Sequence, residues 1–314
     1  MKIFGPNESK LCPPYRGAVA ALGFFDGVHL GHMQLINEAM RIAREKNAPS
    51  MVYTFNIPPK NFGDSVRVLE VTPVNIKSQI LSTIGLDALF IDRFDEAMKG
   101  MTDEEFVRDV LSKKLGLSHV VVGFNYRFGK RAMSGGEELI ALCERYNIGV
   151  TQMPPYLAQD DVPVSSTLIR GLLSNGEVEY ATKLLNRPFF IVSRVIRGQQ
   201  IGSSLDVKTI NQEFIQSTIT PKTGVYISRT TIDGATYKSM TNVGTRPTVN
   251  ENNDIRAETH IIGFNLDVYG EDVKVEFLAR IRDEKKFGAL DELKAQLLLD
   301  TQTTLSYFEK NHME

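Results

Sequence analysis

Two different patterns of hydrophobic and polar positions follow one another along the chain. Between about residues 17 and 186, short apolar runs alternate with longer stretches whose apolar residues recur at helical spacing. Such alternation is typical of buried parallel strands joined by helices, so we predict a doubly wound α/β domain. Thr102 and Glu105 form a capping-box pair, and Gly176 follows a predicted helix end. The predicted strands are 18–22, 50–55, 88–91, 119–123 and 148–153, and the predicted helices are 32–46, 102–115, 136–146 and 167–174.

After Arg187-Pro188 the pattern changes to successive β-branched and aromatic segments. Asp233-Gly234 between two of these segments is typical of a β-hairpin. A helix around 291–300 follows, because three of its leucines form one stripe. The predicted strands are 189–197, 225–231, 236–243, 258–264 and 273–282. We therefore predict a domain at 1–186 and, at 187–314, an antiparallel β-barrel with a terminal helix.

A glycine-rich turn at 23–32 joins the first predicted strand of the α/β domain to its first predicted helix. Two of the five histidines, His29 and His32, lie there and can face the same side of the first helical turn. Free N–H groups and the helix dipole attract anions at such a position, while Gly23, Gly27 and Gly31 let the backbone approach a ligand closely. The segment predicts a phosphate-binding turn. The alternative is a tight turn with two surface histidines.

Three further groups near the predicted sheet edge carry suitable chemistry. Ser165 or Ser166 can cap the helix that bears Arg170, whose guanidinium suits phosphate oxygens; the alternative is an ordinary capped helix with a solvated arginine. The loop 125–128 can present an aromatic face and polar groups to a ligand, although Phe128 is equally suited to the core. Asp26 could hold magnesium or position His29, or simply form the turn before Gly27.

Composition narrows the class of protein. Among 314 residues, 42% are hydrophobic and 24% charged, which is typical of a soluble globular chain, and the net charge of −2 gives no support for nucleic-acid binding by bulk electrostatics. Two cysteines far apart in sequence favour reduced thiols. Since neither a signal-peptide core nor a membrane-spanning run is evident, we expect a cytoplasmic protein with no nucleic-acid or membrane partner.

Taken together, the motifs resemble those of the prokaryotic bifunctional riboflavin kinase/FAD synthetase family. The similar segments, in order, are Gly-Phe-Phe-Asp-Gly-Val-His-Leu-Gly-His at 23–32, Val-Gly-Phe-Asn-Tyr-Arg-Phe-Gly-Lys at 122–130, Val-Ser-Ser-Thr-Leu-Ile-Arg at 164–170, Leu-Asn-Arg-Pro at 185–188, and further segments between 223 and 287. The resemblance implies that the first domain transfers AMP from ATP to FMN and that the barrel phosphorylates riboflavin. It also implies Mg²⁺ as the cofactor, with ATP and FMN or riboflavin as substrates.

The resemblance also assigns roles to individual residues. His29 and His32 would bind the triphosphate and the transition state, Ser165, Ser166 and Arg170 would hold the departing phosphates, and Glu258 would take the proton from the ribityl hydroxyl. The remaining expected site residues are Gly23, Phe24, Asp26 and Gly31 for ATP, Thr209 and Asn211 for ATP and metal, and Asn125, Tyr126, Arg127, Phe128 and Arg282 for the flavin.

The chain departs from the family pattern in both domains. Asp206 and Lys208 replace a glycine and a proline of the kinase phosphate loop; Asp206 would repel a triphosphate, and Lys208 could offset that charge. Phe24 stands where the family usually has asparagine, and Asn-Ile-Pro-Pro at 56–59 stands where it commonly has Asp-Pro-His-Pro. Two other functions therefore remain open: an adenylyltransferase for another phosphate acceptor, and a flavin-binding or regulatory protein that has lost turnover.

Overall fold

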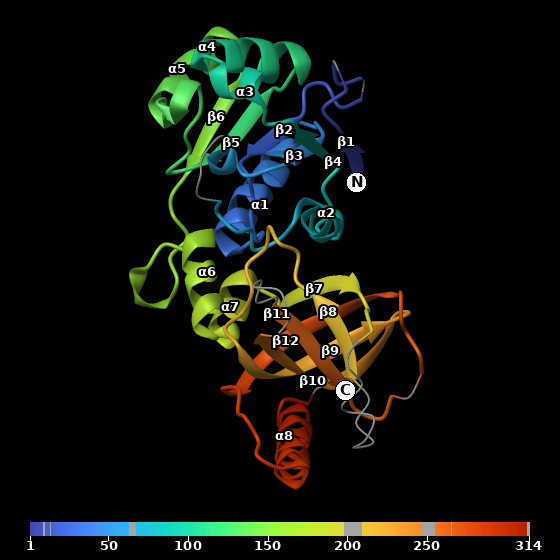
Figure 1. Cartoon of the computed structure of the whole chain (residues 1–314). Coiled ribbons are helices and arrows are strands. Elements are labelled where there is room, and N and C mark those ends of the chain that lie inside the picture. Colours follow the sequence, from blue (N-terminus) through green and yellow to red (C-terminus); the bar gives the residue numbers. More distant parts are fainter. Residues whose placement is uncertain are drawn as a thin grey trace. The chain divides into compact units, whose positions relative to one another are not determined.

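The chain forms two compact units in a computed structural model. The model describes residues 1–8, 10–12, 14–62, 67–197, 209–245, 255–264 and 266–312. The units are Met1–Ser166 and Thr167–Glu314 (Figure 1). The helix pair before Arg187 groups with the second unit because α7 (Val178–Leu185) packs on two of its strands. The domain boundary predicted between 186 and 187 stays a prediction.

The first unit is built on a parallel six-stranded sheet with the order β1-β4-β3-β2-β5-β6. Its strands are β1 (Lys2–Phe4), β2 (Val19–Leu22), β3 (Ser50–Phe55), β4 (Ala88–Asp92), β5 (His119–Gly123) and β6 (Gly149–Met153). The five predicted strands are confirmed to within a residue at each end. The edge strand β1 was not predicted, because three residues carry no readable alternation.

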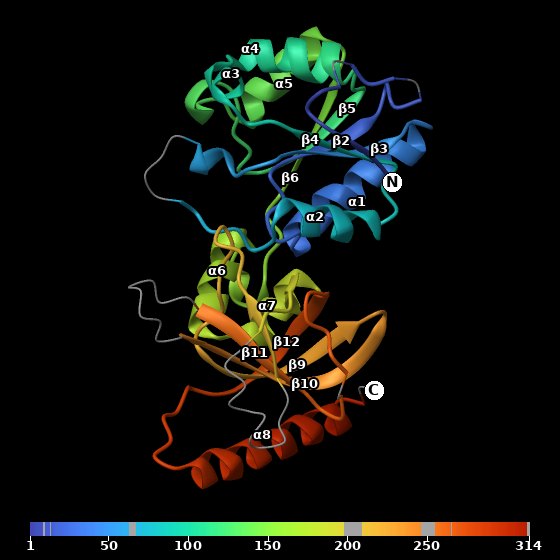
Figure 2. The same ribbon diagram turned by 45° about the vertical axis from the view of Figure 1, so that its right-hand side comes forward.

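Helices cover both faces of this sheet, so the unit has two cores (Figure 2). On one face, α1 (Leu30–Glu45) and α2 (Val74–Ser82) pack against strand residues such as Val19 and Val121. On the other face, η2 (Phe106–Lys114) and α5 (Gly136–Arg145) pack against Ala20 and Val120. Because strands β2 to β5 are buried on both faces, they read as continuous apolar runs rather than as alternating ones.

Two helical regions of this unit differ from the prediction. The predicted helix 102–115 begins with the expected capping box of Thr102 and Glu105, but after α4 (Asp103–Glu105) it continues as the π-helix η2. Helix α2 was missed, because a lysine lies within its short apolar stripe. The remaining elements are α3 (Glu96–Gly100), η1 (Pro59–Asn61), η3 (Lys130–Ala132) and η4 (Gln159–Asp161).

The second unit is a curled antiparallel sheet with the order β7-β12-β9-β10-β11-β8. The segment that follows edge strand β7 meets the other edge strand, β8, where the Ile196 N–H donates to the Asn211 carbonyl at 2.8 Å. This contact brings the ends of the sheet together, and the predicted barrel architecture is thus confirmed (Figure 2). The elements are α6 (Ser166–Asn175), α7, β7 (Phe189–Arg194), β8 (Thr209–Glu213), β9 (Gly224–Ile232), β10 (Ala235–Thr245), β11 (Ile255–Ile261), β12 (Asp272–Arg282) and α8 (Leu290–Lys310).

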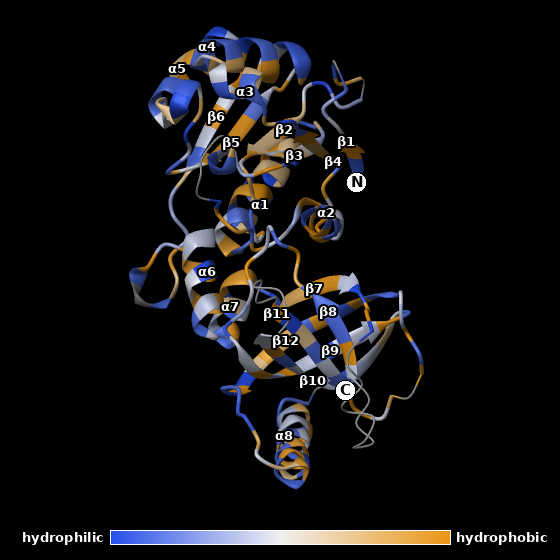
Figure 3. Cartoon of the chain, viewed as in Figure 1, coloured by the Kyte–Doolittle hydropathy of each residue, from blue (hydrophilic) through white to orange (hydrophobic). Residues whose placement is uncertain are grey.

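A chain of buried hydroxyl groups crosses three of the barrel strands. Its links, between 2.7 and 2.9 Å long, join Thr230, Ser239, Ser228, Thr241 and Thr259 in that order, and all five residues are fully buried. The hydroxyls satisfy one another, so their burial is tolerated. Polar residues on the buried side explain why the barrel strands look less hydrophobic than the strands of the first unit (Figure 3).

The long helix α8 is tied to the sheet by an ion pair. Arg282, at the end of β12, donates to both carboxylate oxygens of Asp300 at 2.7 to 3.1 Å, and Asp300 is almost fully buried. The pair gives Arg282 a clear structural function. Its predicted role in flavin binding stays a prediction.

Removing one partner of this ion pair should destabilise the second unit. Asp300→Ala would leave the Arg282 charge half-buried and unpaired, so we expect a loss of about 3 kcal/mol in the free energy of unfolding. Urea unfolding measures the loss, with Glu309→Ala, an exposed acid of the same helix, as the matched control. Equal stabilities for the two variants would show that the ion pair contributes nothing.

Candidate active sites

The edge of the parallel sheet at the carboxyl ends of its strands offers a natural site in the first unit. Strands β3 and β4 continue from β2 toward one side of the sheet, whereas β5 and β6 lie on the other. Ligands of doubly wound sheets bind where the strand order reverses, here between β2 and β5. The two loops that leave these strands are the turn 23–29 and the loop 124–128. Both were singled out from the sequence.

The structure brings the two imidazoles of the turn together. His29 is the N-cap of α1, and its Nδ1 accepts from the His32 N–H at 3.3 Å. The two rings stack with their centroids 3.6 Å apart. A side chain at position 31 would meet the His29 ring, since a Cβ built there lies 3.2 Å from its Cε1 atom, so Gly31 permits the stack. The paired rings lie at a helix N-terminus, where phosphates bind readily.

The backbone of the turn is strained. Phe25 has φ of 56° and Val28 has φ of 44°, and both side chains are buried. Positive φ is unusual for a bulky residue and costs free energy that surrounding contacts must offset. The Phe25 ring provides one such contact, because it packs edge-on against the His32 ring with the two centroids 5.2 Å apart. Strain held in this way is common at functional sites.

Asp26 and Ser166 connect the turn to two other segments of the first unit. The Asp26 carboxylate accepts from the backbone N–H groups of Val71 and Thr72 at 2.8 and 3.1 Å. The Ser166 hydroxyl donates to the Asp26 carbonyl at 2.9 Å, across 140 positions of sequence. Two of the sequence motifs therefore meet in space. A role for Asp26 and the serines in ATP binding stays a prediction.

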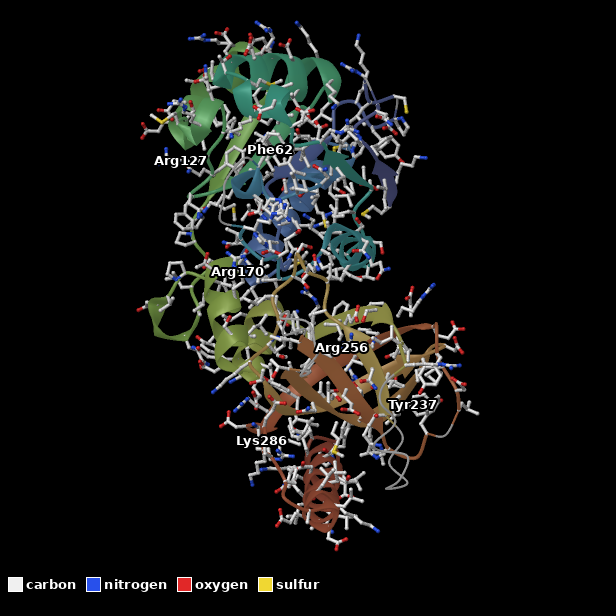
Figure 4. All side chains as sticks on the ribbon, in the orientation of Figure 1. Phe62, Arg127, Arg170, Tyr237, Arg256 and Lys286 are labelled. Atoms are coloured by element: carbon white, nitrogen blue, oxygen red, sulfur yellow. The ribbon has the colours of Figure 1, made fainter. Side chains whose placement is uncertain are left out.

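Arg170 lies on α6 in the second unit (Figure 4). Its guanidinium donates to the Thr167 hydroxyl, one turn earlier, at 3.0 Å. Its expected convergence with the histidines on a triphosphate stays a prediction.

A buried lysine beneath the turn was missed in the sequence. Lys77 of α2 is fully buried, and its ammonium group donates to the Phe24 carbonyl at 2.7 Å and to the Thr54 hydroxyl at 3.3 Å. It also lies 3.9 Å from the centre of the Phe24 ring, a cation–π distance. A lone lysine in a helix normally indicates an exposed position, so the apolar neighbours Ile76 and Leu81 were the sole signal.

Glu70 is a second buried titratable residue, and it lies beside this lysine. Burial raises the pKa of its carboxyl to about 7, against an opposing effect of the Lys77 charge. Among the described residues its Oε2 atom has no hydrogen-bond partner, which agrees with a carboxyl group that is protonated below neutral pH.

Glu70→Gln should therefore change how stability depends on pH. The folded protein holds the Glu70 proton more tightly than the unfolded chain, so ionisation lowers stability as pH rises from 4.5 to about 7. The glutamine variant escapes this loss, so its advantage over the parent should grow by about 3 kcal/mol across that range. Urea unfolding at pH 4.5 and 8 measures it. A difference that does not change with pH would contradict the assignment.

The loop after β5 divides its side chains between core and solvent. Phe128 is buried, and Tyr126 stacks on it with ring centroids 6.0 Å apart. Burial raises the pKa of the Tyr126 hydroxyl. Asn125 and Arg127 are exposed, and Arg127 lies at the periphery of the unit (Figure 4). The flavin roles of these four residues stay predictions. The exposed aromatic ring of the loop is Phe124, which the sequence analysis did not select.

A second candidate site lies on the outer strands of the barrel. In the register of the sheet, Glu258 of β11 pairs with Asn211 of β8 and Asn242 of β10, so the three side chains share one face. The Thr209 hydroxyl donates to the Glu258 carboxylate at 2.8 Å. Glu258 is exposed, and Arg256 forms an ion pair with Glu213 on the same face. Arg256 is labelled on the barrel in Figure 4. Strand β8, which carries Thr209 and Asn211, was not predicted as a strand.

The oxygen atoms gathered there suit a hard cation. The hydroxyl oxygen of Thr209 and the amide oxygen of Asn211 are ligands that Mg²⁺ accepts alongside substrate phosphates. A larger cluster of histidine, cysteine or acidic ligands is not found in the part of the chain that the structure describes. Asp206 and Lys208, which depart from the family pattern, lie outside the described residues.

Comparisons with known proteins cover nearly the whole chain. A family model described as FAD synthetase matches residues 13–168, and one described as riboflavin kinase matches residues 185–308. A bifunctional riboflavin kinase/FMN adenylyltransferase of Bacillus subtilis is 34% identical over 295 residues, covering 93% of this chain and 92% of the relative. The protein of the same description from Escherichia coli K12 is 31% identical over 314 residues, with 98% of each chain covered.

A solved structure shares the fold over the whole length. It is described as a macrolide-efflux protein from Streptococcus pneumoniae, with a TM-score of 0.88, 30% identity, and coverage of 97% of this chain and 99% of that one. The efflux description belongs to that protein. Within the described ranges, none of the helices is both long and apolar enough to cross a bilayer.

Proposed function

The chain belongs to the family of bifunctional riboflavin kinases/FMN adenylyltransferases, and we propose that it makes FMN from riboflavin and FAD from FMN, using ATP in both reactions. One observation carries the proposal: both family models match, in order, and relatives of the same description align along the full chain. The comparisons give no support to a flavin-binding protein without turnover. Phe24, Asp206 and Lys208 are differences within the family.

In the first unit, the chemistry is transfer of AMP. A phosphate oxygen of FMN attacks the α-phosphorus of ATP, the new P–O bond forms, and the bond to the departing pyrophosphate breaks. Negative charge builds up on the transferring and leaving phosphates, so groups positioned beforehand for that charge accelerate the step. We assign this function to His29, His32 and the N-terminus of α1, with Ser165 and Ser166 binding the leaving group. A covalent enzyme intermediate is not required.

In the second unit, the chemistry is transfer of a phosphoryl group. The terminal ribityl hydroxyl attacks the γ-phosphorus of ATP, ADP leaves, and the hydroxyl proton passes to a base. Glu258 is exposed on the barrel face and can act as that base, and the Thr209 hydroxyl orients its carboxylate. Mg²⁺, held by Thr209 and Asn211, would neutralise phosphate charge when bound.

The chain also has properties that favour the cytoplasm. Cys12 is exposed and Cys143 is buried, and both are free thiols. An exposed thiol is best maintained in a reducing compartment. We therefore place the enzyme in the cytoplasm, with small-molecule flavins and nucleotides as its partners.

The direct test is product analysis. The purified chain is incubated with ATP and Mg²⁺ and either FMN or riboflavin, and the flavins are separated by chromatography. We expect FAD from FMN, and FMN followed by FAD from riboflavin. If the enzyme forms FAD from FMN but no FMN from riboflavin, its function is restricted to AMP transfer. If it forms neither product, the result favours a flavin-binding protein. Conversion of a different phosphate acceptor in place of FMN would identify the other adenylyltransferase.

A further inference from the structure

We propose that Lys77 is a positioning residue for AMP transfer, whose buried ammonium group holds the Phe24 carbonyl and so fixes the strained turn that presents His29 and His32. The inference rests on the proposed function of the first unit and adds a residue to it. Lys77 has no exposed surface, and such a buried lysine is rare and costs free energy unless its charge is compensated.

The compensation comes almost entirely from groups in or beside the turn. The Phe24 carbonyl accepts from Lys77 at 2.7 Å, and the Phe24 ring lies 3.9 Å from the same nitrogen. Two carboxylates also act on the lysine charge: Glu70, and Asp26 of the turn itself. Lys77 is therefore joined to the turn through a carbonyl, a ring and a charge.

The position of the hydrogen bond between Lys77 and the Phe24 carbonyl explains how it stabilises the turn. The Phe24 carbonyl precedes Phe25, the first of the two residues with positive φ. A backbone in such a conformation persists when its surroundings fix it from several directions. Thr54, whose hydroxyl donates to the same carbonyl at 2.9 Å, and Lys77 hold one end of the turn, and the Asp26 contacts hold the middle. Without Lys77 the first end has lost its charged donor.

Relaxation of this end would move the stacked imidazoles, which lie at the other end of the turn. A displacement of about 1 Å at a catalytic group can lower a rate by about 100-fold. The ammonium group of Lys77 contacts Phe24 and Thr54, so its effect on the reaction passes through the backbone between Phe24 and the two histidines. The proposal thus predicts a loss of turnover without a comparable loss of substrate affinity.

Lys114 provides a matched control. It too is a largely buried lysine of the first unit, paired with a carboxylate, Asp92, at 2.9 Å and placed 4.9 Å from an aromatic ring, that of Phe90. It lies on η2, against the opposite core from α2. Lys114→Met should therefore reproduce the cost in stability of losing a buried ammonium group while leaving the turn intact.

The experiment compares Lys77→Met and Lys114→Met with the parent enzyme at a temperature where all three are folded. For Lys77→Met we expect kcat of FAD formation to fall about 10- to 100-fold, with KM for FMN within about twofold. Lys114→Met should keep kcat within about twofold, and riboflavin phosphorylation should be unchanged in both. Equal losses of kcat in the two variants, or the parental kcat in Lys77→Met, would overturn the proposal.

Two further readouts separate positioning from general stability. Burial lowers the pKa of Lys77 to about 8, against the opposing charges of Glu70 and Asp26. The kcat of the parent and of Lys114→Met should therefore decline as pH rises through about 8, and Lys77→Met should lack that decline. If the parent makes no FAD, the proposed function fails, and the ring signals of His29 and His32 in NMR decide the inference: a shift in Lys77→Met alone supports it, and unchanged signals refute it.

Discussion

Replacing His32 with alanine should nearly abolish FAD formation while leaving FMN bound. The expected fall in kcat is about 100- to 1,000-fold, because the ring contributes most when charge builds up on the transferring phosphate. Binding of FMN should weaken by no more than about threefold, because the ring stabilises the transition state and contributes little to binding of the substrate. Initial rates with FMN and ATP, together with titration of flavin fluorescence, measure both quantities.

His119→Gln is the control for this prediction. His119 is the first residue of β5, so it lies at the end of the strands opposite to the turn that carries His32. Its ring forms a hydrogen bond of 2.8 Å with the Thr151 hydroxyl. We expect that variant to form FAD at close to the parental rate. Similar losses in the two variants would mean that His32 matters for folding alone, and parental turnover by His32→Ala would remove it from the mechanism.

Replacing Glu258 with glutamine should stop riboflavin phosphorylation. Glutamine keeps the shape and still accepts a hydrogen bond from Thr209, but it cannot take up the hydroxyl proton, so a loss of about 100- to 10,000-fold is expected. FAD formation from FMN should be unaffected. Rates of FMN formation from riboflavin test the prediction.

Glu213→Gln serves as the comparison, because Glu213 is an exposed acid that pairs with Arg256 on the same barrel face. It should retain most of the kinase activity. If Glu258→Gln phosphorylates riboflavin as fast as the parent, the base must be sought among other residues.

The sequence predicted the architecture well where burial produces a clear pattern. Strands β2 to β5 are buried on both faces, so their apolar runs were readable, and the turn at Asp233-Gly234 joins β9 and β10 as expected. Strand β8 was not predicted, because polar residues at both exposed and buried positions, such as the buried Gln212, interrupt the alternation of polar and apolar residues. Gln212 is buried because it donates to carbonyls of Ser193 and Val273, and that long-range contact cannot be inferred from neighbouring residues.

The sequence predicted the motifs of the candidate site but not the buried contacts that hold them in place. The pairing of His29 with His32 follows from helical spacing, whereas the buried Lys77 depends on the three-dimensional position of the Phe24 carbonyl. Tyr126 and Phe128, in the loop after β5, were predicted to bind the flavin because they are aromatic. The structure shows that both pack toward the core and that the exposed ring is the neighbouring Phe124. Sequence order does not reveal which way each side chain points in an irregular loop.

We infer that one chain carries two separate ATP-dependent sites that act in succession on a flavin. Mixing the two inactive variants tests it most directly, by chromatography of the flavins formed from riboflavin, ATP and Mg²⁺. Alone, Glu258→Gln should leave riboflavin unchanged and His32→Ala should stop at FMN, whereas the mixture should produce FAD. A mixture that accumulates FMN without forming FAD, or FAD formation at the parental rate by either variant alone, would show that the two sites do not act in this way.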